Sequence, residues 1–233
     1  MSFAQEFMRG MRKSPPVVLA SAPFGLLFGA LAVDNGFTVG EAVLMSATVY
    51  AGASQMVGLD LFGQNVAPWL IAMSIFAVNF RHVLYSAAVG RRVPHWSAKE
   101  RVFGFFFLID PQYAEAERKA ENGESISFAW FMGMALPIYL FWIAEAWLGA
   151  TFGSLIPNTY ALGLDFLLPI YFLGLVLSFR TRPLWLPIVA TSAVASIIAF
   201  ETIGSPWHVT VGAIAGMVLA AVMPIRASVE DQA

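Results

Sequence analysis

Residues 41–62 read EAVLMSATVYAGASQMVGLDLF, and this stretch decides the fold. It is long enough to cross a lipid bilayer, which takes a helix of about 20 residues. Small and polar residues interrupt it, namely Gly52, Ser54, Gln55, Gly58 and Asp60. Because non-helical backbone at membrane depth is tolerated only when it is buried in protein or lines a wet cavity, we predict a helix that breaks inside a protein bundle.

The rest of the chain has the composition of a membrane protein. Hydrophobic residues make up 58% of the 233 residues and charged residues 12%, about half the charged share of a soluble domain. The apolar stretches are roughly 16–33, 41–62, 66–90, 102–113, 126–150, 160–178, 184–202 and 206–225. We predict an all-α polytopic helix bundle of six to eight membrane segments, with one or two of them re-entrant or broken. A single transmembrane domain, 16–226, is flanked by an interfacial segment, 1–15, and a tail, 227–233.

The basic residues predict the orientation of the chain, because they prefer cytoplasmic loops. If all eight stretches crossed, Arg91 and Arg101 would lie outside. If one of the first three stretches and the short 102–113 stretch dip in and return, twelve of the thirteen basic residues lie inside. Val102–Ile109 is too short for a crossing. We therefore expect a multi-pass protein with both termini in the cytoplasm.

Several classes of function have no support in the composition. The chain has no cysteine, which excludes disulfides and cysteine-ligated metals. Its net charge of −2 gives no indication of nucleic-acid binding. We expect no cofactor, no metal and no enzymatic activity.

A second polar motif, Asn79-Phe80-Arg81-His82, lies inside the apolar stretch 66–90. Ionisable groups at that depth are costly and usually mark a transport path. Arg81 has three interpretations: it binds a substrate carboxylate, it pairs with Asp110 or Asp165, or it extends to the cytoplasmic interface. His82 either relays protons or makes a structural hydrogen bond.

These motifs suit an amino acid substrate. A zwitterion needs donors for its carboxylate, acceptors for its ammonium and an apolar pocket, and a broken helix supplies backbone N–H groups. We predict substrate contacts from Ser54, Gln55, Asn79 and Arg81. The alternative is that Ser54 and Gln55 only hydrogen-bond a neighbouring helix. Predicted helix breaks at Pro23, Gly25 and Gly52 would shape the path. The alternative for Gly25, which forms a G-x-x-x-G pair with Gly29, is ordinary close packing of helices.

Four acidic residues are candidates for an ammonium or a coupled proton, Asp110, Glu145, Asp165 and Glu201. We assign charge balance to Asp110 and Asp165, with His82. Asp165 precedes Phe166-Leu-Leu-Pro169 and also suits an ordinary helix cap. Glu145 comes late in its stretch, which places it near the outer interface.

Several of these motifs, in this order, resemble the AzlC family. They are Gly25-Leu-Leu-Phe-Gly29-Ala-Leu-Ala32, Glu41–Ser46 running into Tyr50-Ala-Gly-Ala-Ser-Gln55, Asn79–His82 with Tyr85, and Leu164–Pro169. The resemblance spans roughly residues 16–178 and departs from the family at Asp110-Pro111. It implies the large subunit of a bacterial exporter of valine, leucine, isoleucine and sometimes methionine in the inner membrane. It also implies a small membrane partner called AzlD, and homo- or hetero-oligomers are compatible with it.

Two other classes of function are compatible with the motifs. A channel for small neutral solutes is the main alternative, because broken helices also line pores. An intramembrane serine hydrolase would need His82 in hydrogen-bond contact with Ser54 and an oxyanion hole. Our prediction is a secondary transporter that works by proton antiport with alternating access.

Overall fold

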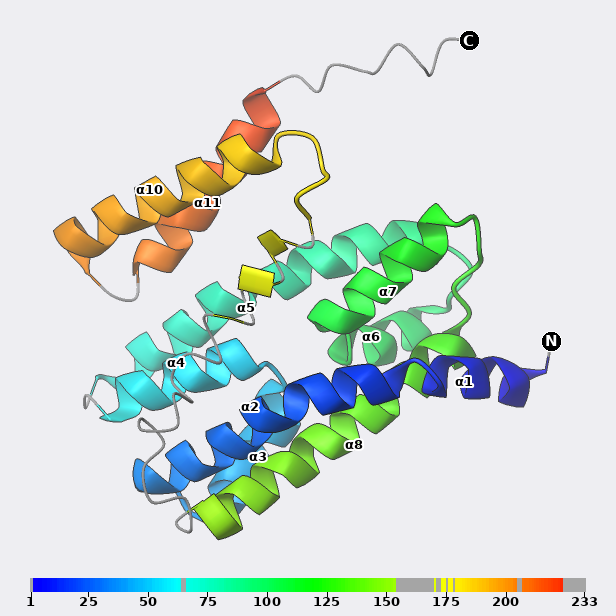
Figure 1. The fold of residues 1–233 in the computed structure, drawn as a ribbon, viewed down its shortest axis with the longest axis horizontal. Coiled ribbons are helices and arrows are strands. Elements are labelled where there is room, and N and C mark those ends of the chain that lie inside the picture. The colour runs from blue at the N-terminus through cyan, green and yellow to red at the C-terminus, as the bar shows by residue number, and fades with distance from the viewer. Residues whose placement is uncertain are drawn as a thin grey trace. The chain divides into compact units, whose positions relative to one another are not determined.

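The structure is a computed structural model of the chain (Figure 1). It describes residues 2–63, 66–153, 170, 173–174, 176–177, 179–204 and 207–223. The chain divides into two compact units, residues 1–164 and 165–233. In the described residues all regular elements are helices, which confirms the predicted all-α class.

The first unit contains eight helices within its described residues. They are α1 (Phe3–Met11), α2 (Ser14–Asp34), α3 (Val39–Val49), α4 (Gly52–Gly63), α5 (Pro68–Arg92), α6 (Ala98–Phe106), α7 (Asp110–Glu121) and α8 (Phe128–Phe152). Capping boxes at Ser2, Thr38 and Ser97 begin α1, α3 and α6, because each side chain accepts a hydrogen bond from an orphan N–H of the first turn.

Within the described residues, four helices are long and apolar enough to cross a membrane: α2, α5, α8 and, in the second unit, α10 (Trp185–Ile203). Shorter apolar helices occupy Val39–Val49 and Thr210–Val222. The predicted stretch 160–178 lies largely outside the described residues, and the tail 227–233 lies wholly outside them. The described helices therefore support a polytopic membrane bundle.

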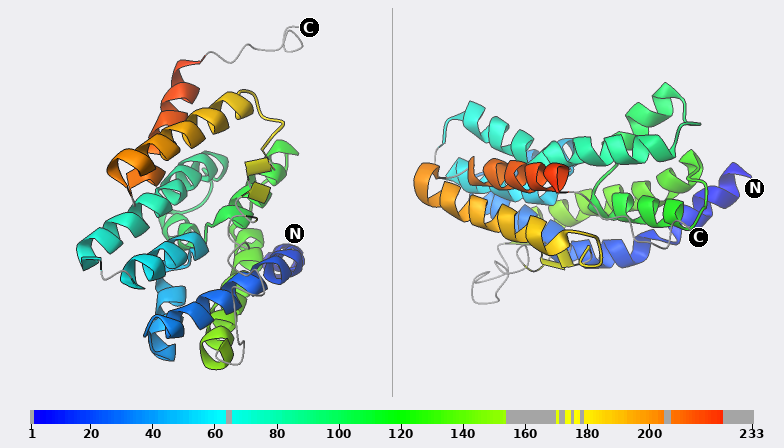
Figure 2. Two further views of the ribbon diagram at one scale, coloured as in Figure 1. Left: turned by 60° about the vertical axis from the view of Figure 1, so that its left-hand side comes forward. Right: turned by 90° about the horizontal axis from the view of Figure 1, so that it is seen from above.

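The tightest seam of the first unit joins α2 and α8, which lie side by side in Figures 1 and 2. Gly29 of α2 faces the backbone carbonyl of Ala146, and Gly149 of α8 faces that of Leu26. A side chain at either glycine would collide with backbone. Small residues let membrane helices approach closely enough to gain dispersion contacts.

Helix α2 runs through Pro23 and Gly25 without a break, so the predicted helix breaks at these two residues are wrong. A proline inside a helix removes only one backbone hydrogen bond, and neighbouring helices often stabilise it in a membrane protein. Gly25 serves close packing instead, since it faces the side chain of Glu145.

Helices α3 and α4 form a re-entrant hairpin, as predicted for one of the first three stretches. The hairpin begins and ends at the same end of the unit: the rings of Phe37 and Phe62 lie 4.6 Å apart, edge to face, and Gly63 contacts the amide of Asn35. Within the hairpin, α3 packs against α8 and α4 packs against α5. The break between them therefore lies inside the bundle.

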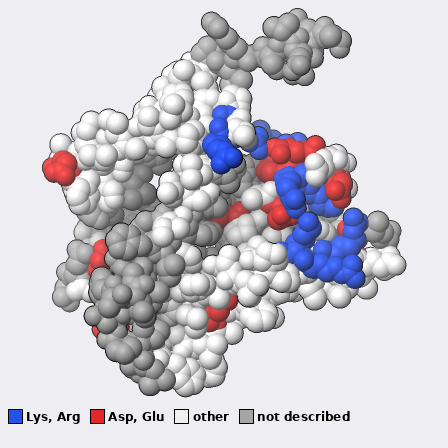
Figure 3. Space-filling view, viewed as in Figure 1, with Lys and Arg blue, Asp and Glu red and all other residues white. Residues whose placement is uncertain are grey.

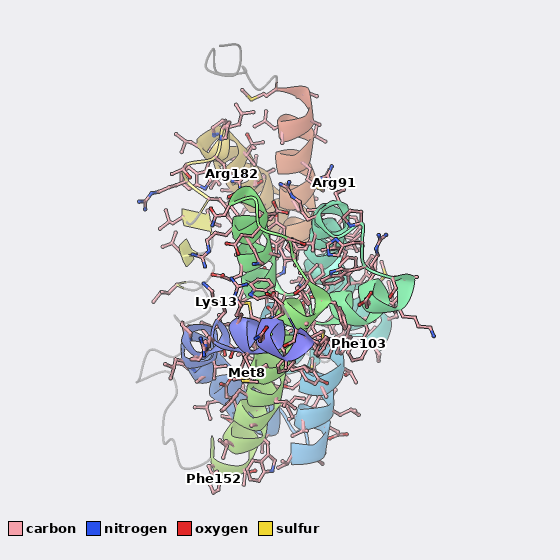
Figure 4. The ribbon with its side chains drawn as sticks, turned by 90° about the vertical axis from the view of Figure 1, so that its right-hand side faces the viewer. Met8, Lys13, Arg91, Phe103, Phe152 and Arg182 are labelled. Carbon is pink, nitrogen blue, oxygen red and sulfur yellow. The ribbon has the colours of Figure 1, made fainter. Side chains whose placement is uncertain are left out.

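Helices α6 and α7 form a second hairpin, which enters from the opposite end. Salt bridges tie α7 and the connection that follows it to the start of the chain and to the end of α5: Lys13–Glu115 at 3.8 Å and Arg92–Glu117 at 3.3 Å from α7, and Arg9–Glu124 at 3.9 Å from the connection. Figure 3 shows Lys, Arg, Asp and Glu side chains gathered on the side that faces the viewer in Figure 4, where Lys13 and Arg91 are labelled. An arrangement in which every stretch crosses would place Arg91 opposite the N-terminus, so the structure agrees with the re-entrant one.

The tips of the two hairpins meet inside the first unit. Tyr50, at the tip of the α3–α4 hairpin, has its ring 6.4 Å from the ring of Phe107 at the tip of the other. Tyr139 of α8 lies against both rings, at 4.9 and 5.1 Å. Two irregular backbone segments are thus buried at the same depth, as broken helices require.

In the second unit, α10 packs against α11 (Trp207–Val222). Gly212 and Gly216 of α11 face Ser192 and Ser196 of α10. This small-residue seam repeats the packing principle of α2 and α8.

Candidate substrate site

The helix break is the centre of the candidate site. Tyr50, the last residue before the break, has a left-handed backbone with φ of 44°, which is rare and strained for an aromatic residue. The carbonyl of Ala51 accepts the first helical hydrogen bond of α4, from the Gln55 N–H at 2.9 Å. The N–H groups of the first turn of α4, which begins at Gly52, have no acceptor within the helix. The break therefore presents buried backbone donors.

Gly52 is where the prediction of a helix break agrees with the structure, since the chain leaves α3 after Val49 and re-enters a helix at Gly52. A side chain at Gly52 would place its Cβ 2.9 Å from the indole ring of Trp142. The glycine allows the α8 indole to pack directly against the start of α4.

Ser54 and Gln55 are fully buried and hydrogen-bond neighbouring helices. The Ser54 hydroxyl donates to Asn79 Oδ1 of α5. Gln55 Nε2 donates to Ser46 Oγ at 3.0 Å, and Trp142 Nε1 donates to Gln55 Oε1 at 3.1 Å. Ser54 and Gln55 therefore make hydrogen bonds to neighbouring helices, as the alternative to direct substrate contact predicted. These hydrogen bonds hold α4 in place beside the break.

Arg81 pairs with Asp110: its guanidinium Nη2 lies 3.3 Å from Asp110 Oδ2. The Tyr85 hydroxyl donates to Asp110 Oδ1 at 2.7 Å, and the Tyr85 ring stacks on Tyr113 at 4.3 Å. Asp110 is the first residue of α7, where the helix dipole also favours a carboxylate. Of the three interpretations of Arg81, the structure shows the ion pair. The other predicted partner, Asp165, lies outside the described residues.

His82 lies beside this pair but does not join it by a hydrogen bond in the described residues. Its ring centroid is 5.9 Å from that of Tyr85, and its Nε2 is buried without a hydrogen-bond partner there. Because the Ser54 hydroxyl bonds Asn79, the described contacts contain no Ser54–His82 pair for a hydrolase.

Sequence reasoning missed two buried polar residues near the break, Tyr50 and Gln112, and it left the acidic candidate Glu145 out of the site. Glu145 is only 6% exposed and packs against Gly25, so it is buried between helices. The reason is the close approach of α2, which covers this face of α8. The Gly25-x-x-x-Gly29 pair was the available signal, since it marks the face of α2 that covers α8.

Together, the apolar spans, the opposed hairpins and the buried polar break define the class: a polytopic helical membrane protein with discontinuous helices around a polar centre. The chain belongs to the AzlC family, a membrane transport family, because the family model described as "AzlC protein" matches residues 16–156.

Relatives agree with this assignment. "Inner membrane protein YgaZ" of Escherichia coli is 29% identical over 97% of this chain and 94% of the relative. An "Uncharacterized membrane protein" of Archaeoglobus fulgidus is 34% identical over 66% of each chain. "Branched-chain amino acid transport protein AzlC" of Bacillus subtilis is 24% identical over 68% of this chain and 61% of the relative. No solved structure matches.

Proposed function

We propose that this protein exports branched-chain amino acids, valine, leucine and isoleucine, together with methionine, across the bacterial inner membrane. It is a transporter rather than an enzyme, works by proton antiport with alternating access, and acts with a small AzlD-type membrane subunit. The observation that carries the proposal is the buried break between α3 and α4, which places the N–H groups of the first turn of α4 inside an apolar bundle. The printed name of the Bacillus subtilis relative supports the substrate class.

In this proposal the substrate carboxylate binds the N-terminal end of α4. The helix has twelve residues, so its N–H groups and dipole favour an anion there. Ser54, Gln55 and Asn79 hold the end of α4 in position through their interhelical hydrogen bonds. The rings of Tyr50, Phe107 and Tyr139 supply the apolar wall for a branched side chain.

Alternating access follows from the two hairpins, which enter from opposite ends and touch at their tips. A displacement of one hairpin would open the centre toward one side while the other hairpin keeps it closed. The Arg81–Asp110 pair couples α5 to the tip of the α6–α7 hairpin, and with His82 it provides the charge balance of the cycle. These are carrier properties, because the site is exposed to one side at a time.

Transport into inverted membrane vesicles tests the proposal directly. Radiolabelled leucine, valine and methionine are added outside the vesicles, with and without a pH gradient that is acidic inside, and with and without the partner subunit. We expect accumulation that depends on the gradient and that vesicles lacking the protein do not show. Absence of gradient-linked uptake in every setting would refute the antiport assignment.

A pair of serine variants tests the role of the break. Ser54→Ala removes the donor to Asn79, whereas Ser74→Ala removes an equally buried hydroxyl that bonds only the Leu70 carbonyl of its own helix. Loss of a buried hydrogen bond costs about 1–3 kcal/mol, so Ser54→Ala should lower the transport rate by about fivefold to a hundredfold. Equal rates in the two variants would contradict the proposed role.

A channel for small neutral solutes is separated from a carrier by counterflow. Vesicles loaded with unlabelled leucine should transiently accumulate external labelled leucine above equilibrium if the protein is a carrier. A channel would only equilibrate the label.

A further inference from the structure

Glu145 is a buried carboxyl without an ion-pair partner in the described part of the chain. It lies in α8, the most buried candidate span, and both carboxyl oxygens are inaccessible and make no hydrogen bond there. No described Lys or Arg forms an ion pair with it. Opposite, a Cβ at position 25 would come within 2.6 Å of Glu145 Oε2, so only glycine leaves room for the carboxyl.

Two further buried polar side chains, Tyr50 and Gln112, also lack a hydrogen bond in the described residues. The Tyr50 hydroxyl is within electrostatic reach of the Glu145 carboxyl and close to the Gln112 amide. Tyr50 Oη, Gln112 Nε2 and Gln112 Oε1 are all buried without a hydrogen bond in the described residues. The Ser21 hydroxyl lies close enough to interact with Glu145, but it donates to the Val18 carbonyl at 3.1 Å.

Such a concentration of unsatisfied groups indicates a ligand. Each buried polar group left without a partner costs about 1–3 kcal/mol, and native proteins contain few of them. Here the residues come from α8, from α7 and from the helix break, so folding brings them together from distant parts of the chain. A role in packing alone would be served better by apolar residues of similar size.

The side chains of Glu145, Tyr50 and Gln112 together favour an ammonium group as the ligand. A carboxylate only accepts hydrogen bonds, and the Gln112 carbonyl oxygen and the Tyr50 oxygen are further acceptors, whereas a primary ammonium carries three donors. Trp142, one turn before Glu145, and Tyr139, which lies edge to face with Tyr50, add aromatic rings that attract a cation. The start of α4, proposed above for the substrate carboxylate, is two residues beyond Tyr50.

We propose that Glu145, Tyr50 and Gln112 form the subsite that binds the ammonium group of the transported amino acid. This inference rests on the proposed function for the identity of the substrate, but the subsite itself can be tested with simple amines. When the substrate leaves, a proton on Glu145 replaces the ammonium. The carboxyl therefore never stays charged and unpaired inside the bundle.

Carbodiimide labelling tests the subsite without measuring transport. N,N′-dicyclohexylcarbodiimide modifies protonated carboxyls in apolar surroundings, and mass spectrometry of the purified protein locates the adduct. We expect modification at Glu145, protection by leucine and by 3-methylbutylamine, and no protection by 4-methylpentanoate, which has the same apolar chain without the amine. Glu145→Gln should remove the adduct. The exposed Glu201 serves as the matched carboxyl whose modification no amine prevents.

The outcomes separate the two proposals. Protection by 3-methylbutylamine without protection by leucine supports the subsite and contradicts the substrate class of the proposed function. Absence of the adduct at Glu145, or an adduct formed equally with and without both amines, overturns the subsite, even if leucine transport is observed. Competition binding gives a second measurement: Glu145→Gln should weaken leucine at least about tenfold and leave 4-methylpentanoate unchanged, and equal losses for both would also overturn it.

Discussion

Replacing Gly29 by alanine should destabilise the protein through the seam between α2 and α8. The added Cβ would lie 2.5 Å from the Ala150 nitrogen and 2.9 Å from the Gly149 carbonyl carbon, and the Ala146 carbonyl oxygen is nearer still. Ordinary contacts begin at 3.4 Å, so the helices must separate by at least about 0.9 Å. A gap of that size removes a quarter to a half of the dispersion energy of each atomic contact along the seam.

Overpacking of this kind costs about 1–3 kcal/mol. The matched control is Gly40→Ala, since Gly40 is exposed in α3 and its added Cβ would touch only the Thr38 hydroxyl, at 4.0 Å. There the same change should stabilise by up to about 1 kcal/mol, because alanine favours a helix over glycine.

Unfolding in mixed micelles with increasing dodecyl sulfate, followed by the fluorescence of the seven tryptophans, measures both variants. Their free energies of unfolding should differ by about 1–4 kcal/mol, with Gly29→Ala the less stable. If Gly29→Ala is as stable as Gly40→Ala, the α2–α8 approach described above is wrong.

Two further predictions concern charged residues. Asp110→Asn removes the charge opposite Arg81 and should cost about 2–4 kcal/mol in the same assay. The double variant with Arg81→Gln should cost clearly less than the sum of the two single changes, and strict additivity would contradict the ion pair. At the N-terminus of α6, hydrogen bonds from the Ser97 hydroxyl and backbone lower the pKa of Glu100 below its ordinary value of 4.5. Because the pKa of Glu100 is lower in the folded state than in the unfolded state, the ionised carboxylate stabilises the fold above about pH 4.5, and this stabilisation is lost as the pH falls through the folded-state pKa. The thermal midpoint of the Glu100→Gln variant should therefore fall less on acidification than that of the unaltered protein. Parallel curves of thermal midpoint against pH would count against the capping box.

The local features of the fold could be predicted from the sequence. The interruption at Gly52 to Gln55 indicates the broken helix, and the short apolar run Val102–Ile109 with Asp110-Pro111 indicates the second re-entrant segment. Both signals act within one or two helical turns, where hydropathy and backbone preference decide. The break predicted at Pro23 was wrong because packing on α8 keeps α2 helical, and packing is not visible in local sequence.

The choice of partners came only from the tertiary structure. Arg81 had two acidic candidates, and within the described residues the fold brings Asp110 to it from α7. Glu145 looked like an interfacial residue by its position in the stretch, and the approach of Gly25 from α2 buries it. Tyr50, Gln112 and Glu145 carry no common motif, since they are separated by tens of residues.

The sequence by itself thus determined that the chain is a helical membrane protein, where its helices break, and which family it resembles. Hydropathy and turn chemistry are properties of neighbouring residues, so they can be read along the chain. The tertiary structure decided which polar groups share the interior. Which groups meet depends on helix-to-helix distances of a few ångströms. The glycines of α2 and α8 permit such close approach, but the sequence does not show which helix approaches which.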